Sequence, residues 1–474
     1  MKLTNSLLRK LPAYAVTPKP HSGPSFESVH ATRKTKLNPA LTTNFSSPLY
    51  ITQGSMQWLW DSEGKRYLDL FGGIVTVSVG HCHPKVNKAL EEQLSTLWHT
   101  TNIYYHPKIH EYVERLTSTL PEHLCCAYFV NSGSEANDLA MYMARLHTKN
   151  YDIISYRNAY HGMSPYTMGL TAHSPWKFPL YTGSGIHHAM NPDPYKGIWG
   201  GSHCRDSPSQ TQRDCSCDPQ GPCMAADKYI EQLDEIGKYS LPKGGKVAAL
   251  FAESIQGVGG AVQFPKGYLK KAVEKIRLWG GLYVADEVQT GFGRTGTHFW
   301  GFEGHGVSPD IVTMAKGIGN GFPMAAIVTT KEVAASMSQA THFNTFGGNP
   351  MASTVGMAVL DAIEEDGCQE NSHKTGSYFI KELEKLREEF EIVGDVRGKG
   401  LMIGMEMVED KKSKTPLNPN KIMQLWDGFK DGSVIVGRGG LAGNVFRFKP
   451  PMCINKEDVD FAIHVMRDVL SKTQ

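Results

Sequence analysis

The chain has 474 residues, which is enough for two or three domains with a large hydrophobic core. Its 49 Lys and Arg nearly balance 47 Asp and Glu, so the formal net charge of +2 excludes a strong field for nucleic acid or for an acidic membrane. No apolar run is long enough to span a bilayer, and the composition is ordinary for a globular enzyme.

The first residues differ in composition from the rest of the chain, because residues 1–26 contain no Asp or Glu. On a helical wheel, leucines share one side and basic residues the other: Leu3, Leu7, Leu8 and Leu11 against Lys2, Arg9 and Lys10. This short, interrupted apolar pattern is typical of a mitochondrial presequence and not of a secretory signal. We expect residues 1–36 to be a presequence and a disordered leader, and the protein to lie in the mitochondrial matrix. The alternative is a disordered tail on a cytosolic enzyme.

Strand and helix patterns alternate through the middle of the chain, after a predicted hairpin at residues 58–73. Apolar runs predict strands at residues 127–130, 153–155, 247–252, 282–285, 311–314 and 325–329. Helices are predicted from Ser134 onward, at residues 268–279 and at residues 457–470. This order predicts an α/β fold: a large domain with a mainly parallel sheet, plus a smaller α+β domain made from both chain ends. We place the large domain at residues 96–355 and the two parts of the small domain at residues 37–95 and 356–474.

Nine cysteines are scattered along the chain, and an odd number without a secreted framework fits a reducing compartment. Four of them lie close together in the sequence: Cys204, Cys215, Cys217 and Cys223. Their spacing lacks the paired knuckles of ordinary zinc modules. We therefore expect an insertion loop at residues 200–224 with reduced thiols and no metal, and a zinc site is the alternative.

Two charged residues stand where hydrophobic predicted strands end. Asp286 follows residues 282–285, and Lys316 comes soon after residues 311–314. Ligands gather at the carboxyl ends of buried parallel strands. An acid and an amine delivered there can serve pyridoxal phosphate, because the lysine forms a Schiff base with the aldehyde and the aspartate keeps the pyridine nitrogen protonated. The alternative is that both are ordinary strand-end residues.

Three further motifs fit a phosphate and an aromatic ring at the same edge. Gly133 and Ser134 open a helix after a strand, so their N–H groups could bind an anion or simply begin a capped helix. Tyr160, beside His161, could stack on a ring or be a buried structural tyrosine. Thr345, in a glycine-containing loop, is a weaker signal for a phosphate contact.

A glycine motif and an arginine complete the set of candidates. Residues 291–296 match G-x-G-x-x-G, but no amphipathic helix follows them, so we expect a loop bordering the cofactor and not a dinucleotide site. Arg397 is flanked by glycine and follows an apolar strand. Its planar fork could bind the carboxylate of an amino acid or form a surface salt bridge.

These motifs, in this order, resemble the class III pyridoxal-phosphate aminotransferases, which have fold type I, over residues 48–470. The most specific stretch is residues 282–296, followed by residues 315–317. The resemblance implies that Lys316 is the Schiff-base lysine and that Asp286 pairs with the pyridine nitrogen. It implies further cofactor contacts by Gly133, Ser134, Tyr160, His161, Glu253, Val288, Gln289 and, toward the neighbouring subunit, Thr345. It also implies a homodimer with a shared active site, which could pair into a tetramer.

The substrate expectation depends on Arg397, to which the resemblance gives the α-carboxylate of the substrate. In ornithine- and 4-aminobutyrate-type members a second acid can pair with the equivalent arginine, whereas Val258 stands there in this chain. We therefore expect Arg397 to stay free for small substrates. Residues 199–208 and 396–402 are similar to the alanine–glyoxylate branch of the family. This implies the conversion of alanine and glyoxylate to pyruvate and glycine, with 3-aminoisobutyrate and methylated arginines as further donors.

Three other functions remain open at this point. The first is a class III omega-aminotransferase of the 4-aminobutyrate or ornithine type. The second is an aminomutase or racemase that uses the same Lys316 and Asp286. The third is a non-catalytic binding or metal protein built on the four cysteines. We expect small amino acids and 2-oxo acids as ligands, and neither nucleic acid nor membrane as a partner.

Overall fold

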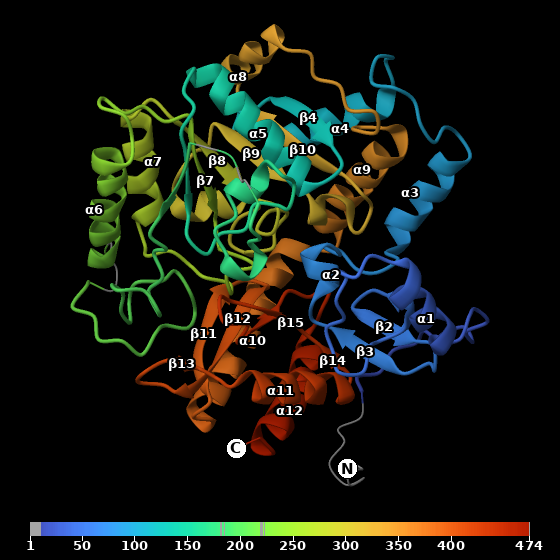
Figure 1. Cartoon of the computed structure of the whole chain (residues 1–474). Helices are drawn as coiled ribbons and strands as arrows, with labels where there is room; N and C mark the ends of the chain where they lie inside the picture. Colours follow the sequence, from blue (N-terminus) through green and yellow to red (C-terminus); the bar gives the residue numbers. More distant parts are fainter. Residues whose placement is uncertain (1–10, 181–182, 184, 219–220, 222, 474) are drawn as a thin grey trace.

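The computed structural model describes residues 11–180, 183, 185–218, 221 and 223–473 and contains three sheets with helices around them (Figure 1). Among these residues no helix is both long enough and apolar enough to cross a membrane. Most of the predicted presequence pattern, at residues 1–10, lies outside the described residues.

The largest sheet has seven strands in the order β4-β10-β9-β8-β7-β5-β6. Its strands are β4 (Cys126–Val130), β5 (Ile153–Tyr156), β6 (Ile186–Ala189), β7 (Ala249–Glu253), β8 (Leu282–Asp286), β9 (Ile311–Met314) and β10 (Ala325–Thr329). Strand β10 pairs antiparallel with β4 and β9, and the pairs from β9 to β6 are parallel. The predicted mainly parallel sheet is confirmed, and only β6 among its strands had not been predicted.

Helices cover both faces of this sheet (Figure 1). They are α5 (Gly133–Thr148) and α8 (Lys331–Ser336) on one face, and α6 (Met224–Tyr239) and α7 (Tyr268–Leu278) on the other. Side chains of β8 alternate between the two layers: Val284 belongs to the core under α5, whereas Tyr283 and Ala285 belong to the core under α7. Because both faces are covered, the strands read as continuous apolar runs.

The two smaller sheets come from the chain ends. One has the order β1-β2-β3-β14, so that β14 from the C-terminal part pairs parallel with β3 of the predicted hairpin. Its strands are β1 (Ile51–Ser55), β2 (Trp58–Asp61), β3 (Arg66–Asp69) and β14 (Val434–Ile435). The other sheet is antiparallel and contains β11 (Val393–Lys399), β12 (Met402–Asp410), β13 (Thr415–Pro416), β15 (Gly437–Gly439) and β16 (Val445–Phe448).

The remaining helices surround these sheets (Figure 1). They are α1 (Phe26–Lys36), α2 (Gly72–Val75), α3 (Pro84–Leu94), α4 (Pro107–Thr117), α9 (Pro350–Glu365), α10 (Cys368–Glu389), α11 (Pro419–Asp431) and α12 (Lys456–Ser471). Short 3-10 helices are η1 (Thr167–Gly169), η2 (Ser174–Trp176), η3 (Gly301–His305), η4 (Lys316–Gly319) and η5 (Met337–Gln339).

The described part of the N-terminal leader contacts the hairpin. The ring of Tyr14 lies 6.0 Å from the rings of both Trp58 and Trp60, and Arg66 donates a hydrogen bond of 2.5 Å to the carbonyl of Pro12. Residues 26–36 form α1, which buries no side chain. Tyr14 thus packs on the tryptophans of the hairpin, whereas α1 lies exposed. The presequence and disordered leader expected at residues 1–36 stay a prediction.

The predicted insertion loop lies between β6 and α6 and is tied to the C-terminal sheet. The guanidinium of Arg205 donates to both carboxylate oxygens of Asp395 at 2.6 and 3.1 Å, and both side chains are only 1% exposed. The expectation of four reduced thiols is not met, since Cys204 and Cys223 are linked in this structure. The backbone brings their Cα atoms within 5.1 Å, which the sequence spacing did not predict.

The buried pair between Arg205 and Asp395 generates a stability prediction. Arg205→Met should lower the free energy of unfolding by roughly 3–5 kcal/mol, because it removes one partner of a buried ion pair. As a control, Lys228→Met breaks an exposed pair with Glu231 and should cost less than about 1 kcal/mol. Thermal and urea unfolding of the purified variants measure the difference. Equal losses of stability in the two variants would contradict the prediction.

Candidate active site

The carboxyl ends of three neighbouring strands bring the predicted chemical groups together. In the parallel register Glu253 of β7 lies opposite Asp286 of β8, and Asp286 lies opposite Thr313 of β9. Lys316 follows β9 with one residue between them, at the start of η4. A single cavity of about 140 Å³ is lined by Lys316 and by both acids.

The carboxylate of Asp286 is held by donors from three different segments. Its Oδ2 atom accepts from Nδ1 of His161 at 2.7 Å and from the side-chain amide of Asn137 at 2.9 Å. Its Oδ1 atom accepts from the backbone N–H of Val288 at 3.2 Å. The hydroxyl of Thr313 donates to the amide oxygen of Asn137 at 2.7 Å and so fixes the orientation of that amide. The acid is therefore fixed as a hydrogen-bond acceptor in the position that the strand end gives it.

His161 is the histidine that contacts this acid, through its Nδ1 atom. Burial lowers the pKa of its imidazole, but the hydrogen bond to Asp286 and the charges of Asp286 and Glu253 outweigh it, so that the pKa is raised overall. Its second ring nitrogen, Nε2, is buried and has no hydrogen-bond partner among the described residues. Asp286 and His161 are thus a hydrogen-bonded pair in the lining of the inner cavity.

Lys316 combines a strained backbone with a weakly basic amine. Its φ angle is +50°, an uncommon value for a residue with a side chain and one that is often found at functional sites. Burial lowers the pKa of its amine to about 8, although Asp286 and Glu253 act in the opposite direction. Lys316 also lines a second cavity of about 560 Å³. The amine therefore stands where the inner cavity meets a larger outer one.

The N-terminus of α5 forms the anion-attracting wall of the inner cavity. Gly133 begins the helix after its N-cap residue Ser132, and Ser134 accepts a hydrogen bond of 3.1 Å from the N–H of Met163. A Cβ atom on Gly162 would lie 2.7 Å from the hydroxyl of Ser134, so only glycine fits there. Backbone N–H groups at a helix start attract phosphate.

The remaining predicted residues line the same cavity. Glu253 accepts from the N–H of Tyr160 at 3.1 Å and from the N–H of Gly257 at 2.7 Å, and burial raises its pKa. Tyr160 and Val288 line the cavity from different segments, and Tyr160 also borders the outer cavity. The amide oxygen of Gln289 accepts a hydrogen bond of 2.7 Å from the amine of Lys449.

Three residues at the site were not predicted from the sequence: Asn137, Arg447 and Lys449. Arg447 lines the outer cavity with Lys316. Arg447 and Lys449 are both buried, with at most 5% of either residue exposed. A signal was present for this pair, since two basic residues alternate with buried phenylalanines in residues 446–449. Period-two alternation in a strand puts such residues on one face, but it does not say what that face meets.

Arg397 is not free, contrary to the expectation from Val258. Its guanidinium donates to Asp395 at 2.9 Å, to Glu406 at 2.8 Å and to the carbonyl of Gly260 at 2.8 Å. Two buried carboxylates raise its pKa above its usual value. The arginine lines a separate cavity of about 440 Å³ with Glu406, and its role toward a substrate stays a prediction.

Thr345 lies apart from the two cavities that Lys316 lines. Its side chain is exposed, in a loop that is attached to the start of α5 through a hydrogen bond of 2.9 Å from Asn131 to Asn344. Its expected contact is with a neighbouring subunit, so its role also stays a prediction.

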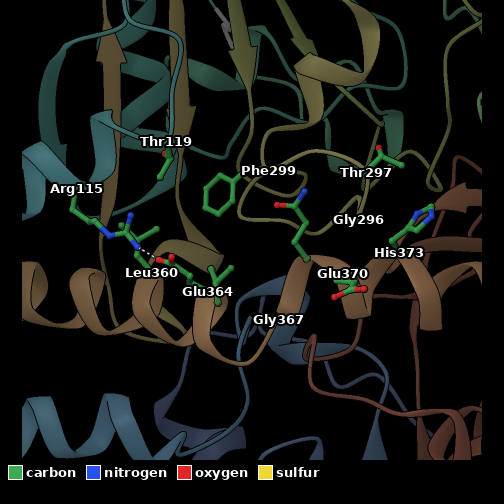
Figure 2. Close-up of a pocket in the computed structure, with 12 residues that line it drawn as sticks. Arg115, Thr119, Gly296, Thr297, Phe299, Leu360, Glu364, Gly367, Glu370 and His373 are labelled. Carbon is green, nitrogen blue, oxygen red and sulfur yellow. Dashed lines mark hydrogen bonds and ion pairs between the residues drawn. The ribbon is translucent and has the colours of Figure 1, made fainter.

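A further cavity of about 820 Å³ lies elsewhere, between the loop that follows β8 and helices α4, α9 and α10 (Figure 2). Residues around it include Phe299, Leu360 and the ion pair of Arg115 with Glu364. It contains none of the predicted site residues. The chemistry therefore belongs to the smaller cavities at Lys316.

Comparisons with known proteins agree with this site. The family model described as Aminotransferase class-III matches residues 42–470. The chain is 54% identical to human mitochondrial alanine–glyoxylate aminotransferase 2, over 99% of this chain and 91% of the relative. It is 44% identical to the mitochondrial alanine–glyoxylate aminotransferase 2 homolog 2 of Arabidopsis thaliana, over 100% of this chain and 93% of the relative. A phospholyase from Arthrobacter, solved in complex with phosphoethanolamine, superposes with a TM-score of 0.83 at 30% identity, over 94% of this chain and 99% of the other.

The lowered pKa of Lys316 predicts its reactivity. In the protein freed of any cofactor, acylation of Lys316 should increase with pH and level off above about pH 8, because the neutral amine is the nucleophile. An unperturbed lysine, with a pKa of roughly 10.4, would still gain about sevenfold between pH 9 and 10. Peptide mass spectrometry after short exposures to the reagent follows the labelling of Lys316. A rate that still rises about sevenfold between pH 9 and 10 would contradict the prediction.

Proposed function

The chain belongs to the class-III aminotransferase family, and from this premise we propose that it transfers the amino group of alanine to glyoxylate, giving pyruvate and glycine. The observation that carries the proposal is the weakly basic amine of Lys316, which stands between two cavities and faces the fixed carboxylate of Asp286. The 54% identity to human alanine–glyoxylate aminotransferase 2 supports the choice of substrates. A mitochondrial location agrees with the names of the relatives.

We propose pyridoxal phosphate as the cofactor. The residues of the inner cavity fit its phosphate, its pyridine nitrogen and its aldehyde. The start of α5, at Gly133 and Ser134, would hold the phosphate. Asp286 would face the pyridine nitrogen, and Lys316 the aldehyde. Bound there, the cofactor supplies an electron sink for the charge that develops at the substrate α-carbon.

The protein's own groups account for the proton transfers. Because the pKa of Lys316 is about 8, roughly a tenth of its amine is neutral at pH 7 and about half at pH 8, and the neutral form can remove the α-proton of the bound amino acid. The protonated amine can then return that proton on the same face of the site. Asp286 is held as a hydrogen-bond acceptor by His161, Asn137 and the N–H of Val288, so it would accept a hydrogen bond from the neighbouring ring nitrogen.

The substrate carboxylate has two candidate partners, and the structure favours Arg447 over Arg397. The guanidinium of Arg447 donates to the backbone carbonyls of Gly257 and Arg438, and it lines the same cavity as Lys316. Arg397 already faces two carboxylates, so a third anion would have to displace one of them. We therefore assign the primary carboxylate contact to Arg447.

We further propose that the chain forms a homodimer in which Thr345 completes the phosphate site of the partner subunit. Large apolar side chains that are 53% to 96% exposed gather in two segments: Trp98, Ile103, Tyr104, Tyr105, Phe343 and Phe346. The rings of His99 and Phe346 lie 5.6 Å apart, so the segments share one surface. Exposed apolar patches of this kind mark subunit interfaces, and Thr345 lies within this one.

The transfer itself can be followed with labelled nitrogen. The purified protein, supplied with pyridoxal phosphate, should move ¹⁵N from alanine to glyoxylate and release pyruvate and glycine in equal amounts, as measured by mass spectrometry. Lys316→Ala should lose at least about 1,000-fold in turnover, because the general base and the covalent anchor are removed together. Racemised alanine without pyruvate, or normal turnover in the variant, would contradict the proposal.

Asp286→Asn tests the role of the acid. The variant should still bind the cofactor but lose roughly 100-fold or more in turnover, because a preorganised charge beside the ring is removed. Asp152→Asn is a matched control, since Asp152 also pairs with a histidine, His187, at 2.8 Å, and neither residue lines the cavities at Lys316. Similar turnover in the two variants would remove Asp286 from the mechanism.

The two arginines can be separated by kinetics. Arg447→Lys keeps a positive charge but loses the planar fork, so it should raise the KM for alanine roughly 10- to 100-fold, the worth of a hydrogen bond to a charged group. Arg397→Lys should raise that KM less. Steady-state kinetics with alanine as the varied substrate, and cofactor absorbance as a check on folding, measure both. A larger KM effect in Arg397→Lys would reverse the assignment.

A further inference from the structure

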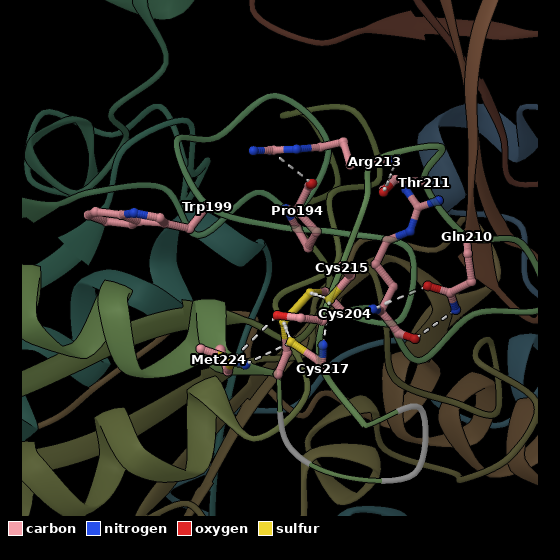
Figure 3. The surroundings of a disulfide bond; sticks show 12 residues. Pro194, Trp199, Cys204, Gln210, Thr211, Arg213, Cys215, Cys217 and Met224 are labelled. Atoms are coloured by element: carbon pink, nitrogen blue, oxygen red, sulfur yellow. Dashed lines mark hydrogen bonds between the residues drawn. A yellow bond between two sulfur atoms is a disulfide. The ribbon is translucent and has the colours of Figure 1, made fainter.

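Four cysteines meet in the loop between β6 and α6, and none of them lines the two cavities at Lys316 (Figure 3). The sulfur atoms of Cys204, Cys215, Cys217 and Cys223 all lie within 4.8 Å of one another. Two of these cysteines are buried and two are partly buried, so water has limited access to the group. The cysteines are spread over residues 204–223, from the loop to the start of α6, so it is the fold that brings their sulfur atoms together.

The sulfur positions suit a tetrahedral metal ion. Zinc binds thiolate sulfur at about 2.3 Å, which places any two sulfurs of a tetrahedral site about 3.8 Å apart. The sulfurs of Cys204 and Cys215 are 3.8 Å apart, and so are those of Cys217 and Cys223. The structure joins Cys204 and Cys223 in a disulfide bond. In the zinc form both sulfurs are thiolates, so this bond either never forms or is reduced with two electrons from a dithiol reductant of the cell.

Backbone N–H donors and a helix start lie against the sulfurs of the cluster. Cys223 is the N-cap of α6, whose start carries the positive end of the helix dipole. The backbone N–H of Met224 donates to the sulfur of Cys217 at 3.2 Å, and the N–H of Cys217 donates to the sulfur of Cys215 at 3.4 Å. Hydrogen bonds of this kind orient the sulfur ligands of a metal ion.

We propose that these four cysteines bind one zinc ion as a structural site. The four cysteines can exist in two states. In one, two of them form a disulfide bond and two are free thiols. In the other, four thiolates bind one ion, and the four thiol protons are released on binding. Only the ion uses all four sulfurs. It also needs no oxidant, which suits the reducing mitochondrial matrix.

The site would fix a loop that reaches the C-terminal sheet. Arg205 directly follows Cys204, and its guanidinium holds Asp395, which in turn binds Arg397. The hydroxyl of Ser207 donates to the carbonyl of Gly398 at 2.8 Å. Zinc would therefore fix the position of Arg205, and through its ion pair with Asp395 also the position of Arg397. The sequence had indicated a loop without metal, because no paired knuckle is present, but the fold supplies the convergence that the spacing lacks.

Metal analysis and thiol counting on the same sample test the proposal. The full-length protein, purified without reductant and dialysed against metal-free buffer, should contain about one zinc per chain by mass spectrometry of metals. After denaturation with a chelator and no reductant, all nine cysteines should titrate as thiols. Seven thiols and no zinc would establish the disulfide and overturn the proposal. Nine thiols and no zinc would overturn it as well, in favour of a reduced loop.

A double variant and a matched control locate the metal. Cys215→Ser with Cys217→Ser should lose the zinc and lower the midpoint of thermal unfolding. Cys82→Ser with Cys125→Ser removes two free thiols outside the cluster and should keep the full zinc content. Zinc retained by the first variant, or lost equally by both, would show an adventitious ion only. These readouts do not depend on catalysis, so they stand or fall separately from the proposed transamination.

Discussion

The burial of ionisable groups at one edge of the large sheet is the constraint on which the rest of the structure depends. Buried charges are costly unless hydrogen bonds or opposite charges compensate them. Asp286 has three donors from three segments, and Glu253 has two backbone donors. Lys316 instead has a pKa lowered to about 8. The helix start at α5, the glycine at position 162 and the strained backbone of Lys316 all follow from fitting these groups around one small cavity.

The C-terminal part of the chain supplies the opposite wall of the site. Arg447 belongs to β16, and Lys449 follows that strand and donates to Gln289. Catalysis by the large sheet therefore depends on how the C-terminal sheet docks against it, and Arg205 and Asp395 form one buried link between them. The similarity to a phospholyase shows that this fold serves more than one reaction. The reaction is then set by the side chains that face the outer cavity.

Much of the fold could be predicted from local pattern, whereas contacts between distant strands could not. Strands β8, β9 and β10 appear within a residue of their predicted bounds, because central parallel strands are continuous apolar runs. The pairing of Arg397 depends on register: Asp395 lies opposite Glu406 in the antiparallel pair of β11 and β12, which puts two acids beside the arginine. Val258 alone could not reveal this. The convergence of the four cysteines, and the packing of Tyr14 on Trp58, likewise needed the three-dimensional arrangement.

The central claim is that Lys316 and Asp286 work on one cofactor that accepts the amino group of alanine. The most direct measurement is the absorbance spectrum of the cofactor-loaded protein during a single half-reaction, without glyoxylate present. Addition of alanine should remove the visible band and release one pyruvate per active site, and glyoxylate should then restore the band. A visible band that alanine leaves unchanged, or pyruvate release without any spectral change, would contradict the account.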